Sequence, residues 1–370
     1  MRQLIKQTIA QLRSQRMLTT VSIIGSALSI FLIMVVVMLH QVQVAPFAPV
    51  SNRPRMLHAQ WGSIQVIENP YYQSNGAISV KTAQTQFANL PNTEAVSIYQ
   101  AFPRSVALQV PGGISFGSDM RSTDDQFWKV FDFTFLHGKP YDKTDLDAIR
   151  LVAVIDRSTA RQLFDTEDAV GRDFLMDFVP YTVVGVVRDI STLADGAFAR
   201  IWVPYTTISE DTWNNGLMGD KSVTVLAHSP NDFNEIRAAY ERNVSEYNKE
   251  IASSGWEFIT RNRPYTQEKA VAGGSANIEP DEKSSQRSRW IIYAILLIVP
   301  AINLSGMTES RMRRRIEEIG VRRAFGCTRM QLLGQLFGEN LLITIVSGLI
   351  GWLLSVGFTF LFSNLLFTES

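Results

Sequence analysis

The sequence has very little cysteine or histidine. Its 370 residues include one cysteine, Cys327, and four widely separated histidines, His40, His58, His137 and His228. One cysteine cannot form a disulfide within the chain, and scattered histidines lack the short spacings that zinc sites use. The sequence therefore predicts neither a disulfide framework nor a metal site.

Motifs for ATP hydrolysis and for nucleophilic catalysis are also lacking. The glycines between residues 112 and 117 are not followed by the lysine of a phosphate-binding loop. Gly113, Ser115 and Gly117 have the Gly-x-Ser-x-Gly spacing of a hydrolase, but a Pro-Gly-Gly turn lies where such enzymes place a strand. We interpret this match as a loop and predict no catalytic residue.

The chain has no net charge, but its charges are unevenly distributed. The first 18 residues hold four basic residues and no acid, and residues 290–370 hold seven arginines and five acids. Residues 40–289 are mildly acidic, with 24 basic and 30 acidic residues. A nucleic-acid-binding domain would need a basic surface, so nucleic acid is not an expected partner.

Three apolar segments predict membrane-spanning helices. The first, at 19–39, follows a basic amphipathic tail at 1–18 and approaches the roughly 20 residues that cross a bilayer. A cleaved signal peptide is the alternative, but its apolar core is usually about 7–15 residues long. We therefore favour an uncleaved anchor, with further spans at 290–307 and 339–363.

Small and polar residues inside the later spans indicate helix contacts. Asn303 lies in the second span, and Ser347, Gly351 and Ser355 recur every four residues in the third. Such positions are typical of close helix packing in membranes. Glu339 lies at the cytoplasmic end of the third span, where deeper burial would make it a candidate site.

Residues 40–289 are predicted to form an α+β domain outside the cytoplasm. After an extended connector at 40–54, strands at 78–80, 95–99 and 105–110 with a helix at 82–90 form the first half. An inserted lobe follows at about 118–205, with a helix capped at 122–125, strands at 151–155 and 181–187, and a helix at 158–164.

The second half of this domain repeats the pattern of the first. A strand at 221–226 and a strand at 256–259 flank one helix, and a polar linker follows at 265–288. The helix has one apolar face, formed by Phe233, Ile236, Tyr240, Val244, Tyr247 and Ile251. The fold class is therefore two β-α-β halves with an inserted lobe, attached to an α-helical transmembrane domain.

The most basic loop, 308–338, lies between the second and third spans. Lysine and arginine are retained on the cytoplasmic side during insertion, which places this loop inside the cell. Because Ile319, Val321 and Phe325 alternate with the charges, we predict short amphipathic helices, broken at Gly320 and Gly326, that dock on a partner. A solvated loop that only sets orientation is the alternative.

Two stretches carry a family resemblance. Residues 318–326 resemble the E-I-G-x-x-R-A-x-G signature of MacB/FtsX-type ABC transporter permeases, although Glu317 stands where that signature has arginine. The strings RSTDDQFWKVFDF at 121–133, VAVID at 152–156 and YTVVGVVRD at 181–189 resemble, in that order, the MacB-type periplasmic core domain.

The resemblance implies a non-catalytic permease subunit for efflux or export, which transmits the motion of an ATPase to its extracytoplasmic domain. It implies a multi-pass protein of the inner membrane, in contact with lipids, with its large domain in the periplasm. It binds no cofactor directly, because ATP is used by a separate cytoplasmic ABC ATPase. That ATPase would contact Arg315, Glu317, Glu318, Ile319, Gly320, Val321, Arg322, Arg323, Ala324, Phe325 and Gly326.

Further expectations follow from the same family. A homo- or heterodimer with a second permease is implied, and a periplasmic adaptor and an outer-membrane channel are possible further partners. The family has a fourth span, so we expect 364–370 to be an outer turn and the chain to be truncated before that helix. The alternatives are a lipoprotein-releasing permease, an FtsX-like regulator of cell-wall hydrolases, and a membrane-anchored sensor.

Overall fold

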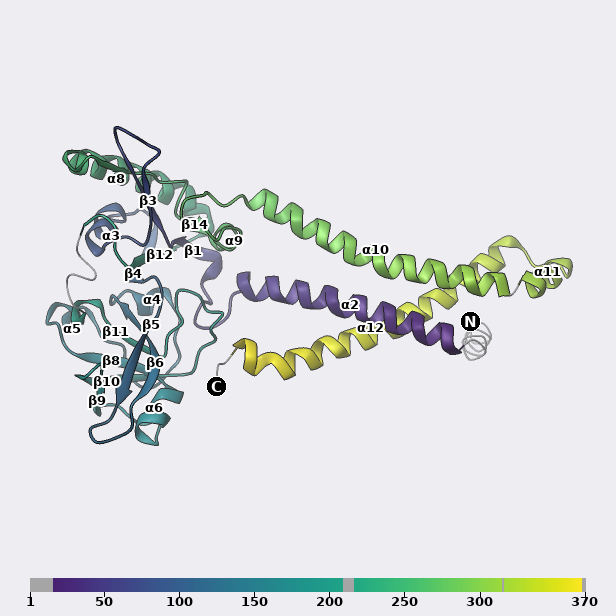
Figure 1. The fold of residues 1–370 in the computed structure, drawn as a ribbon, viewed down its shortest axis with the longest axis horizontal. Coiled ribbons are helices and arrows are strands. Elements are labelled where there is room, and N and C mark those ends of the chain that lie inside the picture. The colour runs from purple at the N-terminus through teal and green to yellow at the C-terminus, as the bar shows by residue number, and fades with distance from the viewer. Residues whose placement is uncertain (1–15, 209–215, 315, 368–370) are drawn as a thin grey trace. The chain divides into compact units, whose positions relative to one another are not determined.

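The computed structural model describes the backbone of residues 16–208, 216–314 and 316–367 (Figure 1). Residues 1–15 of the predicted tail at 1–18, residues 368–370 of the predicted outer turn at 364–370, and Arg315 therefore lie outside the described residues. So do the side chains of Arg16, Leu18, Asn303, Leu304, Met307, Arg311, Arg314, Glu318, Arg322 and 362–367. The chain divides into an α/β unit, Gln43–Glu282, and a helical unit within Met1–Val42 and Lys283–Leu365.

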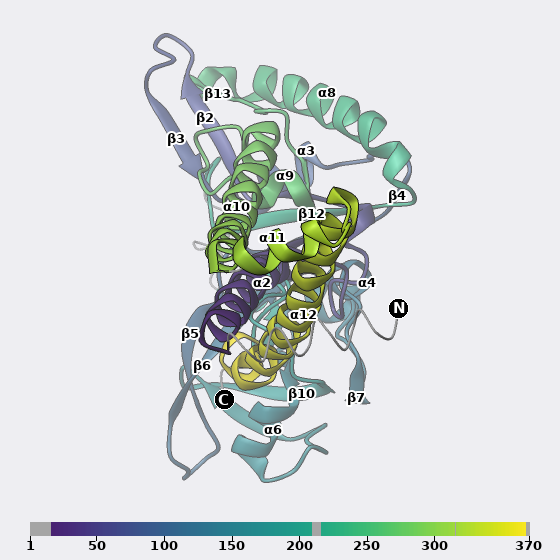
Figure 2. The same ribbon diagram turned by 90° about the vertical axis from the view of Figure 1, so that its right-hand side faces the viewer.

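The helical unit contains α2 (Arg16–Val44), α10 (Glu282–Arg314), α11 (Ile316–Ala324) and α12 (Arg329–Phe367) (Figure 2). Among the described residues, two helices are long and apolar enough to cross a membrane, over Thr19–Val44 and Arg329–Leu361. The second span, 290–307, lies within α10 and remains a prediction.

The α/β unit contains one large sheet, ordered β11-β8-β10-β9-β5-β6-β4-β12-β1-β14, with β7 on β10. These strands are β1 Met56–Ala59, β4 Thr93–Gln100, β5 Arg104–Gln109, β6 Phe116–Thr123, β7 Phe135–Gly138, β8 Val152–Asp156, β9 Asp173–Met176, β10 Val179–Val187, β11 Ile201–Pro204, β12 Lys221–Ala227 and β14 Tyr265–Thr266. A smaller sheet has the order β13-β2-β3, from Trp256–Phe258, Gly62–Val66 and Gln73–Gly76.

Part of the large sheet closes on itself. Besides its pairing with β8, strand β11 pairs in parallel with β6, from Ile201 opposite Met120 to Pro204 opposite Thr123. In the described part of the chain, β6, β5, β9, β10, β8 and β11 thus form a closed ring of strands. The ring has its own hydrophobic core, which includes Leu108, Ile155 and Phe174 and is separate from the core beside the ring. Closure leaves fewer strand edges exposed.

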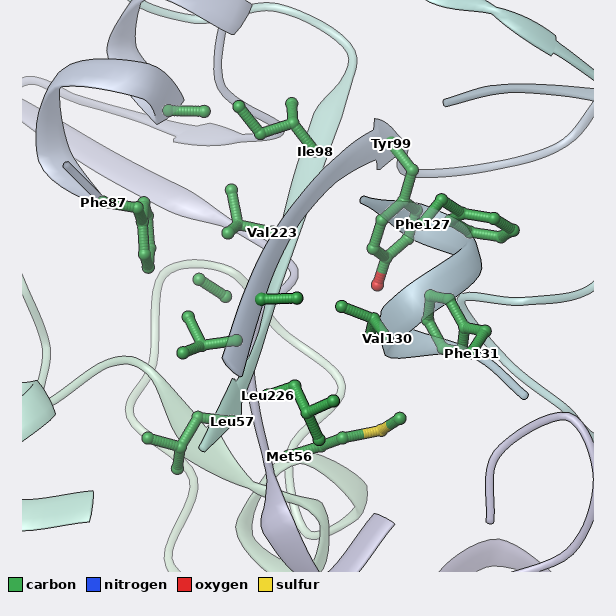
Figure 3. Close-up of a cluster of buried hydrophobic side chains, with 14 of the residues drawn as sticks. Met56, Leu57, Phe87, Ile98, Tyr99, Phe127, Val130, Phe131, Val223 and Leu226 are labelled. Atoms are coloured by element: carbon green, nitrogen blue, oxygen red, sulfur yellow. The ribbon is translucent and has the colours of Figure 1, made fainter. Parts of the chain in front are cut away.

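Beside the ring, the large sheet continues through β4, β12, β1 and β14. The helices that pack beside these strands include α3 (Val80–Gln86), α4 (Phe127–Val130) and α8 (Phe233–Ile251). The predicted helix at 233–251 is confirmed, because its apolar face is buried against this sheet. Figure 3 shows Phe127 and Val130 of α4, and Phe131 directly after it, beside Tyr99 of β4. The Tyr99 and Phe131 rings meet edge to face with centroids 5.7 Å apart, a favoured aromatic geometry.

The structure corrects several predicted elements before the ring. Residues 78–80 are not a strand, because the Ser79 side chain accepts a hydrogen bond from the Thr82 backbone and starts α3. Residues 122 and 123 end strand β6 instead of capping a helix, because they pair with β11. Asp124 still accepts a hydrogen bond from the Phe127 backbone at the start of α4.

The lobe and the linkers also differ from their predicted bounds. The ring includes β5, which precedes the predicted lobe at 118–205. The predicted connector at 40–54 is helical through Val44 and contains the start of a short 3₁₀ helix, η1 (Arg53–Arg55). The linker at 265–288 contains β14, α9 (Gln267–Val271) and the first turns of α10. The strand at 256–259 is β13, which pairs with β2 in the smaller sheet.

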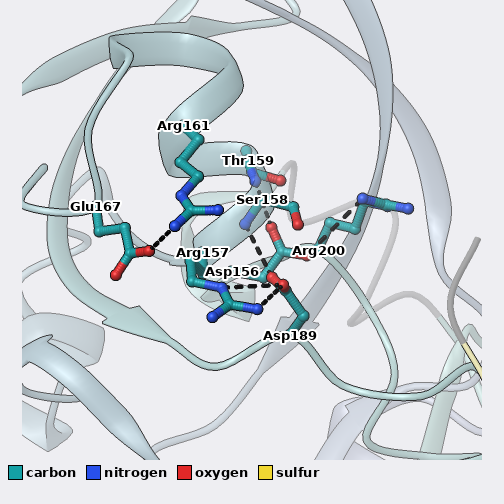
Figure 4. A network of polar contacts seen from close by, with 8 residues as sticks. All are labelled: Asp156, Arg157, Ser158, Thr159, Arg161, Glu167, Asp189 and Arg200. Carbon is teal, nitrogen blue, oxygen red and sulfur yellow. Dashed lines mark hydrogen bonds and ion pairs between the residues drawn. The ribbon is translucent and has the colours of Figure 1, made fainter. Parts of the chain in front are cut away.

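A polar network fixes α6 (Arg157–Phe164) to the ring (Figure 4). Asp156 caps the helix by accepting from the Thr159 amide at 2.7 Å, and Asp189 accepts from the Ser158 amide at 2.8 Å. Asp189 also accepts from the Arg157 guanidinium at 3.0 Å. Carboxylates at a helix N-terminus satisfy its free amides and favour its dipole. Burial nevertheless raises the pKa of Asp156 to about 6.

Candidate functional site

The basic segment 308–338 contains the end of α10, helix α11 and the start of α12, with a turn between α11 and α12. Helix α11 ends at Ala324, where Gly326 has a φ of +90° and its amide donates to the Arg323 carbonyl at 3.1 Å. Glycine tolerates this left-handed conformation, which commonly ends helices. The predicted break at Gly326 is therefore present.

The start of α12 is fixed by a reciprocal cap that the sequence analysis missed. The Thr328 amide donates to Gln331 Oε1 at 2.9 Å, and the Gln331 amide donates to Thr328 Oγ1 at 3.3 Å. Thr-x-x-Gln is a known capping-box pattern, so the string T-R-M-Q at 328–331 could have revealed this start. The cap sets the direction in which α12 leaves the turn.

The predicted break at Gly320 is wrong, because Gly320 lies inside α11. An interior glycine costs a helix only about 1 kcal/mol relative to alanine, which neighbouring turns can offset. Among the described residues beyond its own turn of helix, no atom lies within 4 Å of a Cβ added at Gly320, so this position is open.

Gly320 lines a groove of about 790 Å³ between α10, α11 and Asn340 of α12. The apolar part of its lining comes from Met312, Ile316 and Ile319. Its charged side chains are Glu309, Arg313 and Arg323. The complete lining is Ser305, Thr308, Glu309, Met312, Arg313, Ile316, Ile319, Gly320, Arg323 and Asn340. An apolar groove with charged margins suits an inserted side chain or helix of a partner.

Large apolar side chains also point outward from this segment. Phe325 is 88% exposed, and Val321, Met330, Leu333 and Phe337 are exposed as well. Buried aromatic anchors dominate binding energy in many interfaces. These side chains and the groove together make the segment a candidate docking surface.

The charged residues of the predicted coupling set are placed only in part. Glu317, Arg323 and Ala324 are exposed, whereas the side chains of Glu318 and Arg322 lie outside the described residues. Arg313 donates to Glu309 one turn earlier at 2.8 Å. Such an exposed pair contributes little to stability, so both charges are available to a partner.

A polar contact joins two helices at the groove. Thr308 Oγ1 on α10 donates to Asn340 Oδ1 on α12 at 3.1 Å. Glu339, next to it, is only 2% exposed, and Gln335 Nε2 donates to Glu339 Oε1 at 3.4 Å. Glu339 is thus more deeply buried than an interfacial residue needs to be, which makes it part of the candidate site.

The small residues predicted for helix packing lie in a buried face of α12. Ser347, Gly351 and Ser355 are all buried, and Gly351 packs on Ala27 and Ile30 of α2. The opposing helix contributes its own small buried residues, Thr19, Ser22, Ser26 and Ser29. Their spacing of three and four residues could have been found in the sequence. The Asn303 side chain lies outside the described residues.

The structure gives no support for chemistry at the other motifs. Ser115 lies in a loop and is followed by strand β6, whereas a hydrolase nucleophile is followed by a helix. Within the described residues, no three His, Cys, Asp or Glu side chains come together as metal ligands.

Comparisons with known proteins match both parts of the chain. Residues 19–243 match the profile described as MacB-like periplasmic core domain, and residues 290–370 match FtsX-like permease C-terminal. The chain is 27% identical over 237 residues to a "Macrolide export ATP-binding/permease protein MacB" of Chromobacterium violaceum, covering 64% of this chain and 34% of that one.

A second relative and a solved structure are similar. A protein of the same description from Burkholderia cenocepacia is 30% identical over 242 residues, covering 65% of this chain and 33% of that one. The chain thus spans about a third of the length of these relatives. The periplasmic region of MacB from Actinobacillus actinomycetemcomitans is 19% identical with a TM-score of 0.38, covering 54% of this chain and 88% of that structure.

Proposed function

The chain belongs to the family of ABC-type transporter permeases that combine a MacB-like periplasmic core domain with an FtsX-like permease domain, and we propose that it couples a separate ATPase to efflux or export. The matched domains are permease domains only. The relatives are named as ATP-binding/permease proteins, so an ATP-binding partner is the expected complement to this chain.

The observation that carries the proposal is the groove around Gly320 with the exposed Phe325 beside it. A partner helix seated in the groove would bury Ile316 and Ile319, while Arg313 and Arg323 would pair with its acids. Buried apolar anchors supply affinity, and the charges supply orientation and association rate.

In the proposed mechanism, ATP binding changes the distance between two ATPase subunits and so displaces 308–338. The helices α10 and α12 continue directly from this segment, so a displacement at α11 moves their ends. An ATP cycle can shift the conformational equilibrium of the extracytoplasmic domain only to a limited extent. The limit is the difference in binding free energy between the ATPase and the two conformations of the permease. The substrate would be handed on by that domain in the periplasm of an inner-membrane protein.

The test is co-purification of the full chain with candidate ATPases in mild detergent. Glu318→Ala with Gly320→Trp, or Gly320→Trp alone, is expected to remove the ATPase, because tryptophan fills an open position in the groove. Gly274→Trp is the control, since Gly274 is equally open but lies in the α/β unit. An ATPase retained by both Gly320 variants would contradict the docking site. Failure of every ATPase to bind the native chain would favour a sensor.

A further inference from the structure

The segment that follows the first apolar helix is bound to the α/β unit. Val44 ends α2, and the carbonyls of Gln43, Ala45 and Pro49 accept hydrogen bonds from Gln267, Arg53 and Asp132 of the unit. The Asp132 amide donates to the Pro49 carbonyl at 2.7 Å, and Ser51 Oγ donates to Asp132 Oδ2 at 3.0 Å. This connector is therefore an ordered part of the unit and not a free tether.

Arg53 makes the most deeply buried of these contacts. Arg53 is only 3% exposed. One terminal nitrogen of its guanidinium donates to the Ala45 carbonyl at 2.8 Å, and the other donates to the Leu193 carbonyl at 3.0 Å. The guanidinium also lies over the Phe47 ring, 4.7 Å from its centroid. Burying an arginine is costly unless its donors are satisfied, and its planar fork suits two acceptors held at a fixed separation.

The two carbonyls belong to segments far apart in the sequence. Ala45 directly follows α2, whereas Leu193 lies in the loop between β10 and β11, two strands of the ring. That loop is itself anchored, because Trp202 Nε1 donates to the Ala197 carbonyl at 3.1 Å and Arg121 Nε donates to the Phe198 carbonyl at 2.9 Å. One guanidinium therefore links the residue after α2 to the loop between two strands of the ring.

A second contact within the α/β unit holds its first residue, Gln43, in the last turn of α2. Gln267 Nε2 on α9 donates to the Gln43 carbonyl at 2.8 Å. The last carbonyls of a helix have no partner within the helix, so this side chain satisfies one of them. Thr266 caps α9 in turn by accepting from the Lys269 amide at 3.4 Å.

We propose that Arg53, assisted by Gln267, is the positioning residue that passes movement of the first membrane helix to the strand ring. This inference rests on the proposed function. The buried guanidinium keeps Ala45 and Leu193 at a fixed separation, so the connector and the ring move together. Without it, the connector would still bind near Asp132 but could slide relative to the β10–β11 loop.

The experiment uses the full chain in complex with the ATPase that co-purifies with it, in lipid nanodiscs. Amide hydrogen exchange is measured with and without a non-hydrolysable ATP analogue. Native protein is expected to show a nucleotide-dependent change both at 308–338 and in the ring strands. Arg53→Gln is expected to retain the change at 308–338 and to lose it in the ring. Arg53→Lys, which keeps one donor site, and Gln267→Ala should each lose part of it.

Arg263→Gln is the matched control. Arg263 is an equally buried arginine whose guanidinium donates to Ser63 Oγ at 3.0 Å and to the Ala276 carbonyl at 2.5 Å, neither of which lies in the connector or in the β10–β11 loop. It should lower the unfolding temperature but keep the nucleotide response of the ring, which separates transmission from stability. If Arg53→Gln does not fold, Arg53→Lys and Gln267→Ala decide the question.

The outcomes distinguish the two proposals. A ring response that stays at its native size in the Arg53 and Gln267 variants overturns the role of Arg53 and leaves the proposed function intact. A native complex with no nucleotide response at 308–338 overturns both. Equal loss in the Arg263 variant would assign Arg53 a purely structural role and overturn the inference.

Discussion

A Cβ atom added to Gly351 would lie 2.8 Å from the carbonyl oxygen of Ala27. Helices α12 and α2 therefore meet through their backbones, although they come from opposite ends of the chain. The Phe31 and Phe358 rings extend the same contact, with centroids 5.7 Å apart, and so does the hydrogen bond from Thr359 Oγ1 to Met38 Sδ at 3.2 Å. Small residues allow this close approach in a membrane, where packing replaces the hydrophobic effect as the driving force.

Gly351→Leu is expected to destabilise the chain, because a backbone carbonyl cannot move away as a flexible side chain can. Overpacking typically costs about 1–3 kcal/mol, which exceeds the roughly 1 kcal/mol that a helix gains when glycine is replaced. The measurement is the unfolding temperature in detergent. Gly348→Leu is the control, because no described atom from outside its own turn of helix lies within 4 Å of its added Cβ. Equal effects at both positions would contradict the close contact.

Phe325→Ala is expected to weaken ATPase binding without changing the stability of the permease. A truncated aromatic anchor typically costs about 2 kcal/mol, or roughly thirtyfold in Kd. Removing the Phe325 ring should change the free energy of unfolding little, because the ring is exposed in the folded chain. Titration of the purified ATPase measures the effect. Ile114→Ala, at a residue that is 90% exposed in the α/β unit, should leave Kd unchanged; a native Kd for Phe325→Ala would remove this residue from the interface.

The sequence predicted those parts of the fold that local patterns determine. The helix at 233–251 has its observed bounds because its apolar period is regular over five turns. The strand at 151–155 is β8, shifted by one residue, because a short apolar run in this context suits a buried strand. The short and polar strands β2 and β3 have no such pattern, and they were missed.

Non-local pairing accounts for the remaining errors. Ring closure depends on β11 meeting β6 across some eighty intervening residues, which no local pattern encodes. The same pairing turns the polar residues 122 and 123 into strand. At the candidate site, the signature at 318–326 indicated the candidate docking segment, but the groove needs α10 and α12 as well as α11. Glycine weakens helices, which favours a break at Gly320, yet its cost of about 1 kcal/mol is too small to interrupt α11.

Cys327 tests the orientation of the chain. It lies in the turn between α11 and α12, where the proposed topology places it in the cytoplasm. A membrane-impermeant thiol reagent is expected to label it only after cells are permeabilised. Tyr71→Cys in a Cys327→Ser background is the positive control, since Tyr71 is 97% exposed in the α/β unit. Labelling of Cys327 in intact cells would reverse the topology.

His58 is expected to make the fold less stable in acid. Burial lowers the pKa of His58 to about 4, and the charge of Arg53 acts in the same direction against the opposing effect of Asp195. Between pH 6.5 and 4 the unfolded chain binds a proton that the folded chain does not, so stability is full above pH 6.5 and falls as the pH drops toward 4.

His58→Gln tests this expectation. Glutamine can keep the hydrogen bond with Thr224 Oγ1, which the His58 Nδ1 atom makes at 3.2 Å, but it cannot be protonated. Unfolding temperatures measured at pH 7, 6, 5 and 4 should therefore fall less in the variant than in the native chain. Parallel curves for the two proteins would show that His58 is not responsible for acid sensitivity.

Asp124 is expected to act in the opposite direction. Burial raises its pKa to about 7, although its carboxylate accepts hydrogen bonds from the Ile98 amide at 2.7 Å, Ser97 Oγ at 2.8 Å and the Phe127 amide at 3.0 Å. Its folded pKa lies above the unfolded value of 3.8, so the folded chain binds the proton more tightly. Its contribution to stability is full below pH 3.8 and is lost as the pH rises through 7.

Asp124→Asn should accordingly remove a decline in stability between pH 4 and pH 7. Each unit of pKa difference corresponds to about 1.4 kcal/mol, so a few kcal/mol separate the two ends of this range. The variant loses an acceptor for one of the three donors and is therefore less stable in acid, but its unfolding temperature should change less with pH. Asp125→Asn, at the neighbouring residue, should keep the native profile. If Asp124→Asn also keeps it, the three hydrogen bonds outweigh burial and the carboxylate is charged in the folded protein.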